Sequence, residues 1–285
     1  MHLDAVPRVD RNDFRVPRLG GEPRVVVGNV AGWPALERWD SDYLRAVAGG
    51  VEVVVRERNG PPNNMYQHLA QGGAVPFGDY LDWVLATAGD LQPVTADLTD
   101  PRQITGLVAA SRLDVSYYLD ANLVRLSPTL TSDAPDPQWF RRPAPDVNFW
   151  CGVQGTSSGL HCDVSPNCNV QVVGSKHFSL FPPSSARRLG RIGHGTHCRV
   201  DPNALDLRRF PRAADVRGFE TTLGPGESLY IPVGWFHQVT VTSAWAVNVN
   251  FFWPRPFPQG LAVPMLWGFL LRRGRARLAR TLGGG

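Results

Sequence analysis

Two histidines and an aspartate occur at positions from which they could bind one metal ion. His161 and Asp163 are separated by one residue, so in a β-strand their side chains point to the same face. His237 begins a stretch that alternates through Val239 and Val241, which places its imidazole on the face of these valines. Two imidazoles and one carboxylate form the facial ligand set of non-haem Fe(II), which leaves coordination positions open for substrates.

A buried lysine would add another functional group to this face. Residues 169–181 alternate between mostly polar odd positions and mostly apolar even positions, which predicts a single β-strand. Lys176 shares the even positions with Phe178 and Leu180, so it falls on the predicted core side. The strand could instead lie at an edge, from which the amine reaches water, or the period could be misassigned. Otherwise the ammonium group needs a buried anion, because an unpaired buried charge is very costly.

Together, the two histidines, the aspartate and the lysine predict one chemistry. An iron ion held by three side chains can be chelated by a 2-oxo acid, and Lys176 can hold the far carboxylate of that acid. The cosubstrate then supplies the anion that the lysine needs. Taken singly, these signals are weak, because a His-x-Asp tripeptide arises by chance and a histidine beside valines is often a hydrogen-bonded core residue.

The elements that would position these side chains are mostly short strands. From about residue 114 the hydrophobic period becomes two, and turn residues separate the apolar runs. Strands are predicted within residues 114–126, 146–155, 169–181, 227–234, 237–243 and 245–253. Many short strands of this kind suggest a sandwich or barrel that closes its edges.

The N-terminal part of the chain mixes helical and strand patterns. We expect strands over residues 24–30 and 51–58, a loop over 32–39, and helices over 41–50, 76–90 and 99–111. Ser41 is the predicted N-cap of the first of these helices. These elements favour a mostly β or α+β chain rather than a helical bundle.

Charge and cysteine content limit the classes of protein. The net charge is +4, but a C-terminal segment of five arginines without an acid carries it, and the remainder has a net charge of 4 − 5 = −1. A general nucleic-acid interaction is therefore disfavoured. The four cysteines form no CxxC pair, the opening residues are polar, and no apolar run is long enough to cross a bilayer. We expect a soluble cytoplasmic protein with reduced thiols.

The motif that joins these residues resembles a known family. Residues 155–184 read GTSSGLHCDVSPNCNVQVVGSKHFSLFPPS, and they are followed by RRFP, GPGESLYIPVGWFHQV and VNVNFFW. The sequence is similar to the JmjC/cupin-like Fe(II)/2-oxoglutarate oxygenases, especially the small hydroxylases related to the asparaginyl hydroxylase that inhibits the hypoxia-inducible factor. The resemblance covers about residues 15–255. It implies a double-stranded β-helix, or jelly-roll, core with flanking helices, N-terminal α/β elements and a C-terminal helix.

The resemblance also implies roles for individual residues. His161, Asp163 and His237 match the iron ligands, which form the catalytic centre, and Lys176 matches the lysine that binds 2-oxoglutarate. Ser158 matches a hydroxyl that helps to hold the same carboxylate.

Three further positions match cosubstrate contacts of the family. Tyr118 falls where the family often has a tyrosine that contacts this carboxylate, and the adjacent Tyr117 could take the role after a one-residue shift. Asn167 and Asn250 match polar positions near the iron-binding end of the cosubstrate.

The family's chemistry gives an expected function. Fe(II), 2-oxoglutarate and O2 would hydroxylate an unactivated C–H bond, and the intact Asp163 favours hydroxylation over halogenation. An amino-acid side chain in a peptide or protein is the expected target. A small metabolite or an RNA base is an alternative substrate, and a cupin-like binding module without turnover is an alternative function.

Two segments are rich in arginine. One, residues 185–217, lies between parts of this motif, and the other is the C-terminal segment that follows it. We expect one catalytic domain over residues 1–258, with its core at about 114–255, and a helical segment over 259–285. Residues 185–217 form an insertion with eight Arg and three Asp, whose Arg187, Arg188 and Arg191 could steer an anionic substrate or could simply be solvated. The C-terminal segment is expected to form a homodimer interface, with membrane attachment, nucleic-acid binding or a solvated tail as alternatives.

Overall fold

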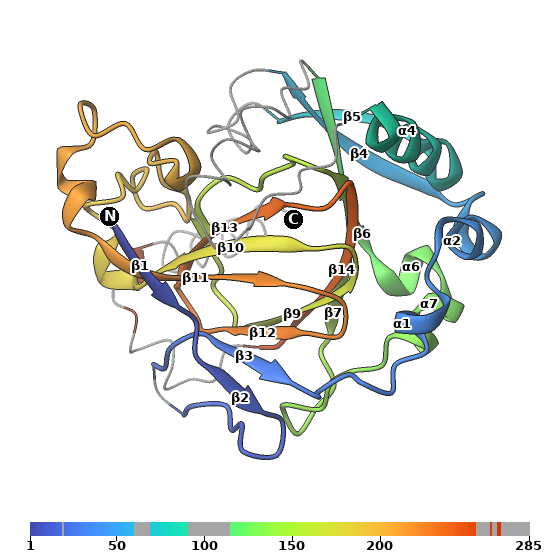
Figure 1. The fold of residues 1–285 in the computed structure, drawn as a ribbon, viewed down its shortest axis with the longest axis horizontal. Coiled ribbons are helices and arrows are strands. Elements are labelled where there is room, and N and C mark those ends of the chain that lie inside the picture. The colour runs from blue at the N-terminus through green and yellow to red at the C-terminus, as the bar shows by residue number, and fades with distance from the viewer. Residues whose placement is uncertain (19, 60–68, 91–114, 255–262, 264–266, 269–285) are drawn as a thin grey trace, which may run out of the picture.

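Two β-sheets pack face to face in the computed structural model, which describes residues 1–18, 20–59, 69–90, 115–254, 263 and 267–268 (Figure 1). The smaller sheet contains, in spatial order, β1 (His2–Ala5), β11 (Arg217–Leu223), β10 (Lys176–Phe181), β13 (Phe236–Val241) and β8 (His161–Cys162). The larger sheet contains β2 (Arg8–Asp10), β3 (Arg24–Val27), β12 (Ser228–Ile231), β9 (Asn167–Val173), β14 (Trp245–Phe252), β7 (Asp146–Val153), β6 (Val115–Asn122), β4 (Glu52–Asn59) and β5 (Leu69–Pro76).

An apolar cluster joins the inner faces of the two sheets. Phe178 and Leu180 of β10 pack there with Leu229 and Ile231 of β12 and with Val25 of β3. All five side chains are buried, so this cluster fixes the distance between the sheets. The mostly β, jelly-roll prediction is confirmed by this arrangement.

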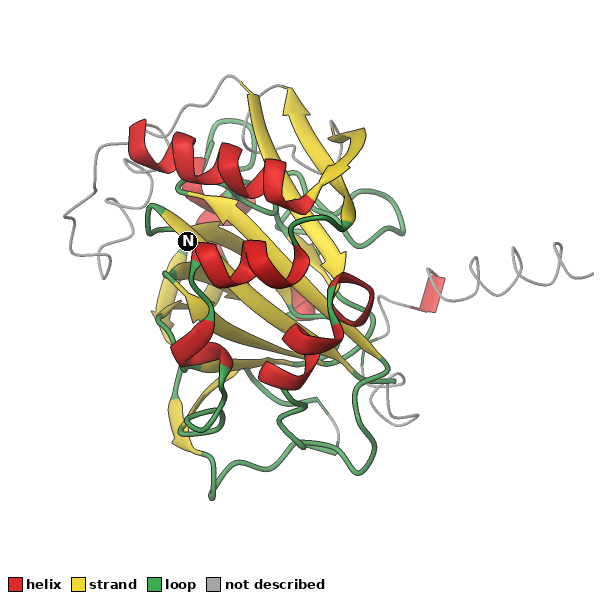
Figure 2. Cartoon of the chain, turned by 90° about the vertical axis from the view of Figure 1, so that its right-hand side faces the viewer, coloured by secondary structure: helices red, strands yellow, loops and turns green. Residues whose placement is uncertain are grey.

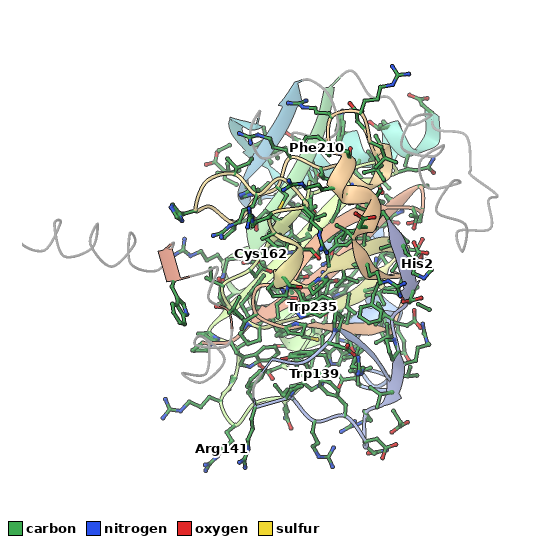
Figure 3. All side chains as sticks on the ribbon, turned by 90° about the vertical axis from the view of Figure 1, so that its left-hand side faces the viewer. His2, Trp139, Arg141, Cys162, Phe210 and Trp235 are labelled. Carbon is green, nitrogen blue, oxygen red and sulfur yellow. The ribbon has the colours of Figure 1, made fainter. Side chains whose placement is uncertain are left out.

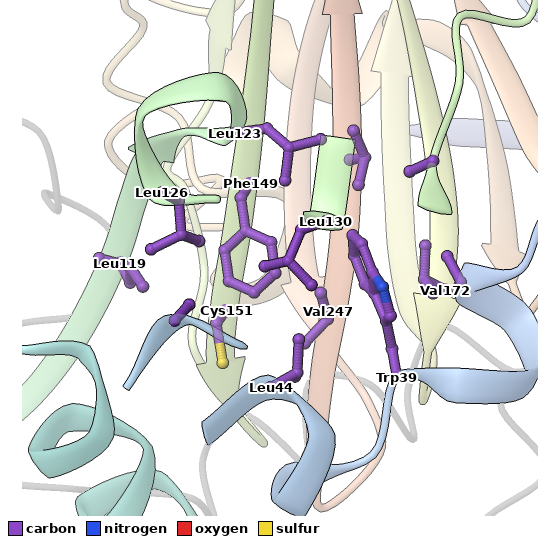
Figure 4. Packing of buried hydrophobic residues seen from close by; sticks show 14 of the residues in the cluster. Trp39, Leu44, Leu119, Leu123, Leu126, Leu130, Phe149, Cys151, Val172 and Val247 are labelled. Carbon is purple, nitrogen blue, oxygen red and sulfur yellow. The ribbon is translucent and has the colours of Figure 1, made fainter. Parts of the chain in front are cut away.

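The helices cover the outer face of the larger sheet, as Figure 2 shows. They are α1 (Ala35–Arg38), α2 (Ser41–Ala48), α4 (Phe77–Asp90), α6 (Leu123–Leu126) and α7 (Pro128–Asp133). Their apolar side chains pack on the strands in the largest buried cluster, in which Leu44, Leu130 and Trp39 contact the layer of Phe149 and Val247 (Figure 4). Across the described residues, none of the helices is long and apolar enough to cross a membrane.

Residues 169–181 do not form the single strand that the sequence predicts. They form β9 and β10, which belong to different sheets and are separated by Gly174, in the left-handed region at φ +66°, and Ser175. The crossing also changes the face of the even positions. Val170 and Val172 pack under the helices, whereas Phe178 lies between the sheets. The period of two is correct within each strand, but it does not continue through the turn.

Several predictions for the N-terminal half are confirmed and others are wrong. The helix expected over residues 76–90 is α4. Residues 35–38 form α1 instead of a loop, and Asp40 rather than Ser41 caps α2, because its carboxylate accepts a hydrogen bond from the Tyr43 backbone N–H. The predicted helix over 99–111 lies outside the described residues.

Replacing Gly174 by Ala should destabilise the crossing between the sheets. The left-handed backbone disfavours any Cβ, and this Cβ would also collide with Ser243 Oγ and the Trp245 carbonyl oxygen. We expect a loss of about 2–5 kcal/mol in the free energy of unfolding, measured by guanidinium titration. Gly193→Ala is the matched control, because its φ is +56° but its Cβ would meet nothing within 4 Å, so it should cost only about 1–2 kcal/mol. Equal losses in the two variants would contradict this account.

Candidate metal centre and adjoining cavity

Three potential ligands converge where β8 meets β13. These two strands pair in antiparallel register with His237 directly opposite His161, and Asp163 follows the end of β8. The two imidazole centroids are 4.4 Å apart, and His237 Nε2 lies 3.5 Å from Asp163 Oδ2. One ligand atom from each of the three residues falls within 4.8 Å of the others. Residues 76 positions apart in sequence are thus brought together, as the spacing and the strand faces predict.

Hydrogen bonds to backbone carbonyl oxygens orient the two imidazoles. Nδ1 of His161 lies 3.1 Å from the Gly159 carbonyl oxygen, and Nδ1 of His237 lies 3.1 Å from the Trp235 carbonyl oxygen. A carbonyl oxygen only accepts, so each Nδ1 carries a proton. In the neutral tautomer, Nε2 then has the lone pair that a metal ion needs.

The donor set fits a non-haem iron ion. Two neutral imidazoles and one carboxylate are its usual protein ligands, and neutrality is favoured here because burial, followed by the neighbouring His237, lowers the pKa of His161 to about 4. In this way the imidazole remains unprotonated at neutral pH. The carboxylate of Asp163 is fixed by Asn167, whose Nδ2 donates to Oδ2 over 2.6 Å.

Lys176 lies in the same cavity as the three ligands. The cavity has a volume of about 270 Å³ and is lined by Lys176, His161, Asp163 and His237 among other, mainly polar, residues. Only 2% of the lysine is exposed, and burial lowers the pKa of its ammonium group to about 7. In the described part of the chain its hydrogen-bond acceptor is Asn248 Oδ1. The buried position predicted from the alternation is therefore confirmed, with a polar neighbour that carries no charge.

Asn248 connects the lysine to two further amides on the inner face of the larger sheet. Its Nδ2 donates to Asn250 Oδ1 over 2.6 Å and to Asn169 Oδ1 over 3.1 Å. All three asparagines line the cavity. Of the three, the family resemblance predicts only Asn250, whereas Asn248 and Asn169 were not predicted. The alternation in residues 247–250 carried this signal, because it places Asn248 and Asn250 on one face.

The remaining predicted cosubstrate residues have different positions. Ser158 lines the cavity, where its Oγ accepts a hydrogen bond from the Val239 backbone N–H and donates one to the Gly159 carbonyl oxygen. Asn167 is not among the described residues that line the cavity. Its Nδ2 donates to the carboxylate of Asp163, one of the three potential metal ligands. The side chains of Tyr117 and Tyr118 lie outside the described residues, and their role stays a prediction.

The insertion of residues 185–217 supplies one side of the cavity. Its backbone pairs with β8, because the Cys162 N–H donates to the Thr196 carbonyl oxygen and the Cys198 N–H to the Leu160 carbonyl oxygen, each over 2.9 Å. His197 thereby faces the cavity with its ring 5.7 Å from that of His161, and burial lowers its pKa to about 4. The residues around His197 have no strand pattern, so the sequence does not predict its position beside this cavity.

The three arginines proposed to steer a substrate lie away from this cavity. Among the described residues, those that line it do not include Arg187, Arg188 or Arg191. Arg191 instead braces the insertion, where Nε donates to the Gly195 carbonyl oxygen over 2.7 Å and Nη2 to the His194 carbonyl oxygen over 3.0 Å. Steering by these residues stays a prediction.

Comparison with known proteins connects this site to one family. The cupin-like domain family matches residues 14–259. The chain belongs to this family. It is 27% identical to the Jumonji C domain-containing protein 5 of Drosophila melanogaster over 246 residues, which is 82% of this chain and 55% of that protein. The resemblance to the JmjC/cupin-like proteins is thereby confirmed.

Two further relatives carry more specific names. The chain is 28% identical over 287 residues to the human bifunctional peptidase and (3S)-lysyl hydroxylase JMJD7, a match that covers 87% of this chain and 84% of that protein. It is 34% identical over 154 residues to the tRNA wybutosine-synthesizing protein 5 of Danio rerio, covering 49% and 46% of the two chains. The cupin-like chain spans about half the length of several relatives, such as the Drosophila protein.

Lys176→Met should remove a destabilisation of the folded protein that grows as the pH falls from 10.5 toward 7. The lysine titrates near pH 7 in the folded protein, and its ordinary value of 10.5 applies in the unfolded chain. Stability that is fully present above pH 10.5 is therefore lost as the pH falls toward 7, by about 1.4 kcal/mol per pH unit. The free energy of unfolding of the wild type, minus that of the Met variant, should rise by about 2–3 kcal/mol between about pH 7 and pH 9. Guanidinium titrations that give a constant difference would show that the amine is solvated.

Proposed function

We propose that this chain is an Fe(II)- and 2-oxoglutarate-dependent dioxygenase that hydroxylates an unactivated C–H bond of an amino-acid side chain in a peptide or protein. The proposal rests on one cavity that contains both a set of potential metal ligands and a buried lysine. The ligand atoms of His161, Asp163 and His237 converge, and the buried ammonium group of Lys176 lies beside them without a charged partner among the described residues.

In the proposed reaction, the protein binds and orients the reactants. His161 and His237 would offer Nε2 to Fe(II), and Asp163 would offer a carboxylate oxygen that Asn167 keeps in place. When bound, Fe(II) with 2-oxoglutarate and O2 supplies the oxidising chemistry that inserts oxygen into a C–H bond. Three protein ligands would leave coordination positions for the cosubstrates.

The strand register supports a dicarboxylate between the metal site and the lysine. In the pairing of β10 with β13, His237 lies opposite Leu180 and Lys176 lies opposite Val241, four residues further along β13. At about 3.3 Å per residue, these positions are roughly 13 Å apart along the strand. A lysine side chain and a five-carbon dicarboxylate can together span this interval. A carboxylate beside Lys176 would also raise the lysine pKa and restore its charge.

The names of the relatives favour an amino-acid substrate. The human lysyl hydroxylase is the relative of these three that the chain covers most completely. A modified RNA base is the second candidate, because the zebrafish tRNA wybutosine-synthesizing protein has the higher identity over its shorter match. A small metabolite or a binding module without turnover are the remaining alternatives. The predicted dimer interface lies almost wholly outside the described residues and stays a prediction.

Removal of a metal ligand should abolish cosubstrate turnover. We expect His161→Ala and Asp163→Ala each to lower 2-oxoglutarate-dependent succinate formation at least about a hundredfold and to weaken Mn²⁺ binding in anaerobic calorimetry. His194→Ala is the matched control, since this histidine lies exposed in the insertion. Mn²⁺ binding of undiminished affinity in the two ligand variants would refute the metal assignment, whatever the turnover.

The role of Lys176 can be separated from general damage to the cavity by a pair of ligands. 2-Oxovalerate has the same carbon chain as 2-oxoglutarate but lacks the far carboxylate. Lys176→Met should weaken 2-oxoglutarate binding by about tenfold to a hundredfold, and should change 2-oxovalerate binding by less than about threefold. Fluorescence titration with Mn²⁺ present measures both, and equal weakening of the two ligands would contradict the assignment.

A further inference from the structure

A second cavity, separate from the candidate metal site, lies between a helical turn at the start of the insertion and another near its end. It has a volume of about 580 Å³ and is lined by Ser184, Arg187, Arg188, Arg212 and Asp215. The first turn is η2 (Pro183–Ser185) with the residues that follow it, and the second is η4 (Pro211–Asp215). These five residues do not line the first cavity.

Apolar packing beneath the two turns holds the arginines in place. Ala186 and Leu189 from the first turn share a buried cluster with Ala213 and Val216 from the second. Because these four side chains point into the protein, the neighbouring arginines project outward, and all three are exposed. Sequence positions 187, 188 and 212 thus meet at one surface of the insertion, which Figure 1 shows beside β1 and β11.

Among the described residues that line this cavity, positive charge exceeds negative charge. Three guanidinium groups face a single carboxylate, that of Asp215. Among the described residues, Arg187, Arg188 and Arg212 make no side-chain hydrogen bond or ion pair, in contrast to the neighbouring Arg191, which binds two backbone carbonyl oxygens. Guanidinium groups are planar forks that bind carboxylate or phosphate oxygens in pairs. An anion in the cavity would relieve the mutual repulsion of the three groups.

We propose that this cavity is a docking site for an anionic side chain of a polypeptide, either phosphorylated or carboxylic. The presence of Asp215 favours a polypeptide over a nucleic acid. Its carboxylate can accept a backbone N–H from a peptide, but it repels the continuous negative charge of a phosphodiester chain. The site is independent of the proposed oxygenase activity, because none of its residues contacts the metal cavity. The sequence suggested Arg187, Arg188 and Arg191 as contacts for an anionic partner. At this cavity, Arg212 takes the place of Arg191.

Small probes can test the site without knowledge of the natural partner. N-acetyl-phosphoserine amide and N-acetyl-glutamate amide represent the two kinds of anionic side chain, each with backbone N–H groups. N-acetyl-serine amide lacks the anion, and the dinucleotide UpU represents a phosphodiester. Binding is followed through the arginine Nε–H signals in NMR spectra of the full chain, with neither iron nor 2-oxoglutarate present, so that catalysis does not affect the result.

The proposal predicts saturable shifts with the phosphoserine probe, the glutamate probe, or both, at least about tenfold tighter than with N-acetyl-serine amide or UpU. Arg188→Ala and Arg212→Ala should each weaken this binding about tenfold. Arg141→Ala is the matched control, because Arg141 is exposed at the opposite end of the molecule from Phe210 of the insertion (Figure 3). Shifts that are absent, that are as strong with UpU, or that persist in both insertion variants would overturn the proposal.

Discussion

The pairing of β13 with both β8 and β10 is the constraint on which the site depends. In these two pairings, His237 lies opposite His161 of β8 and opposite Leu180 of β10. Lys176 of β10 lies opposite Val241, four residues further along β13. Since side chains alternate faces with a period of two, a slip of one residue would turn His237 outward and bring Gln238 to the centre. The metal site and the lysine are thus fixed by one set of backbone hydrogen bonds, and their separation is a property of the smaller sheet.

Burial of the Lys176 ammonium group in the cavity costs free energy. Lowering the pKa of Lys176 from 10.5 to about 7 corresponds to roughly 5 kcal/mol of unfavourable burial of the ammonium group. Asn248 offsets part of this with one neutral acceptor, and Asn169 and Asn250 orient that amide. The fold therefore holds a buried amine whose charge an anionic ligand would stabilise. The free energy released when a carboxylate arrives would contribute to cosubstrate affinity.

The sequence predicts which side chains gather at the candidate site better than it predicts their surroundings. Alternation of side chains identifies His161, Asp163, His237 and Lys176, because a period of two is a local property of each strand. It fails at Gly174, where the chain crosses between sheets and the face of the even positions changes. Contacts made by the insertion could not be foreseen, since His197 and Arg212 are placed by tertiary packing and not by a periodic pattern. The short strands β1 and β2 were missed because pairing with β11 and β3, rather than apolar composition, defines them.

The most direct test of the account is a crystal structure of the protein grown anaerobically with Mn²⁺ and 2-oxoglutarate. The account predicts one ion coordinated by Nε2 of His161, a carboxylate oxygen of Asp163 and Nε2 of His237. It further predicts that the far carboxylate of 2-oxoglutarate lies within hydrogen-bond distance of Lys176 Nζ. An ion bound elsewhere, or a cosubstrate whose far carboxylate is held by other residues while Lys176 remains on Asn248 alone, would contradict it.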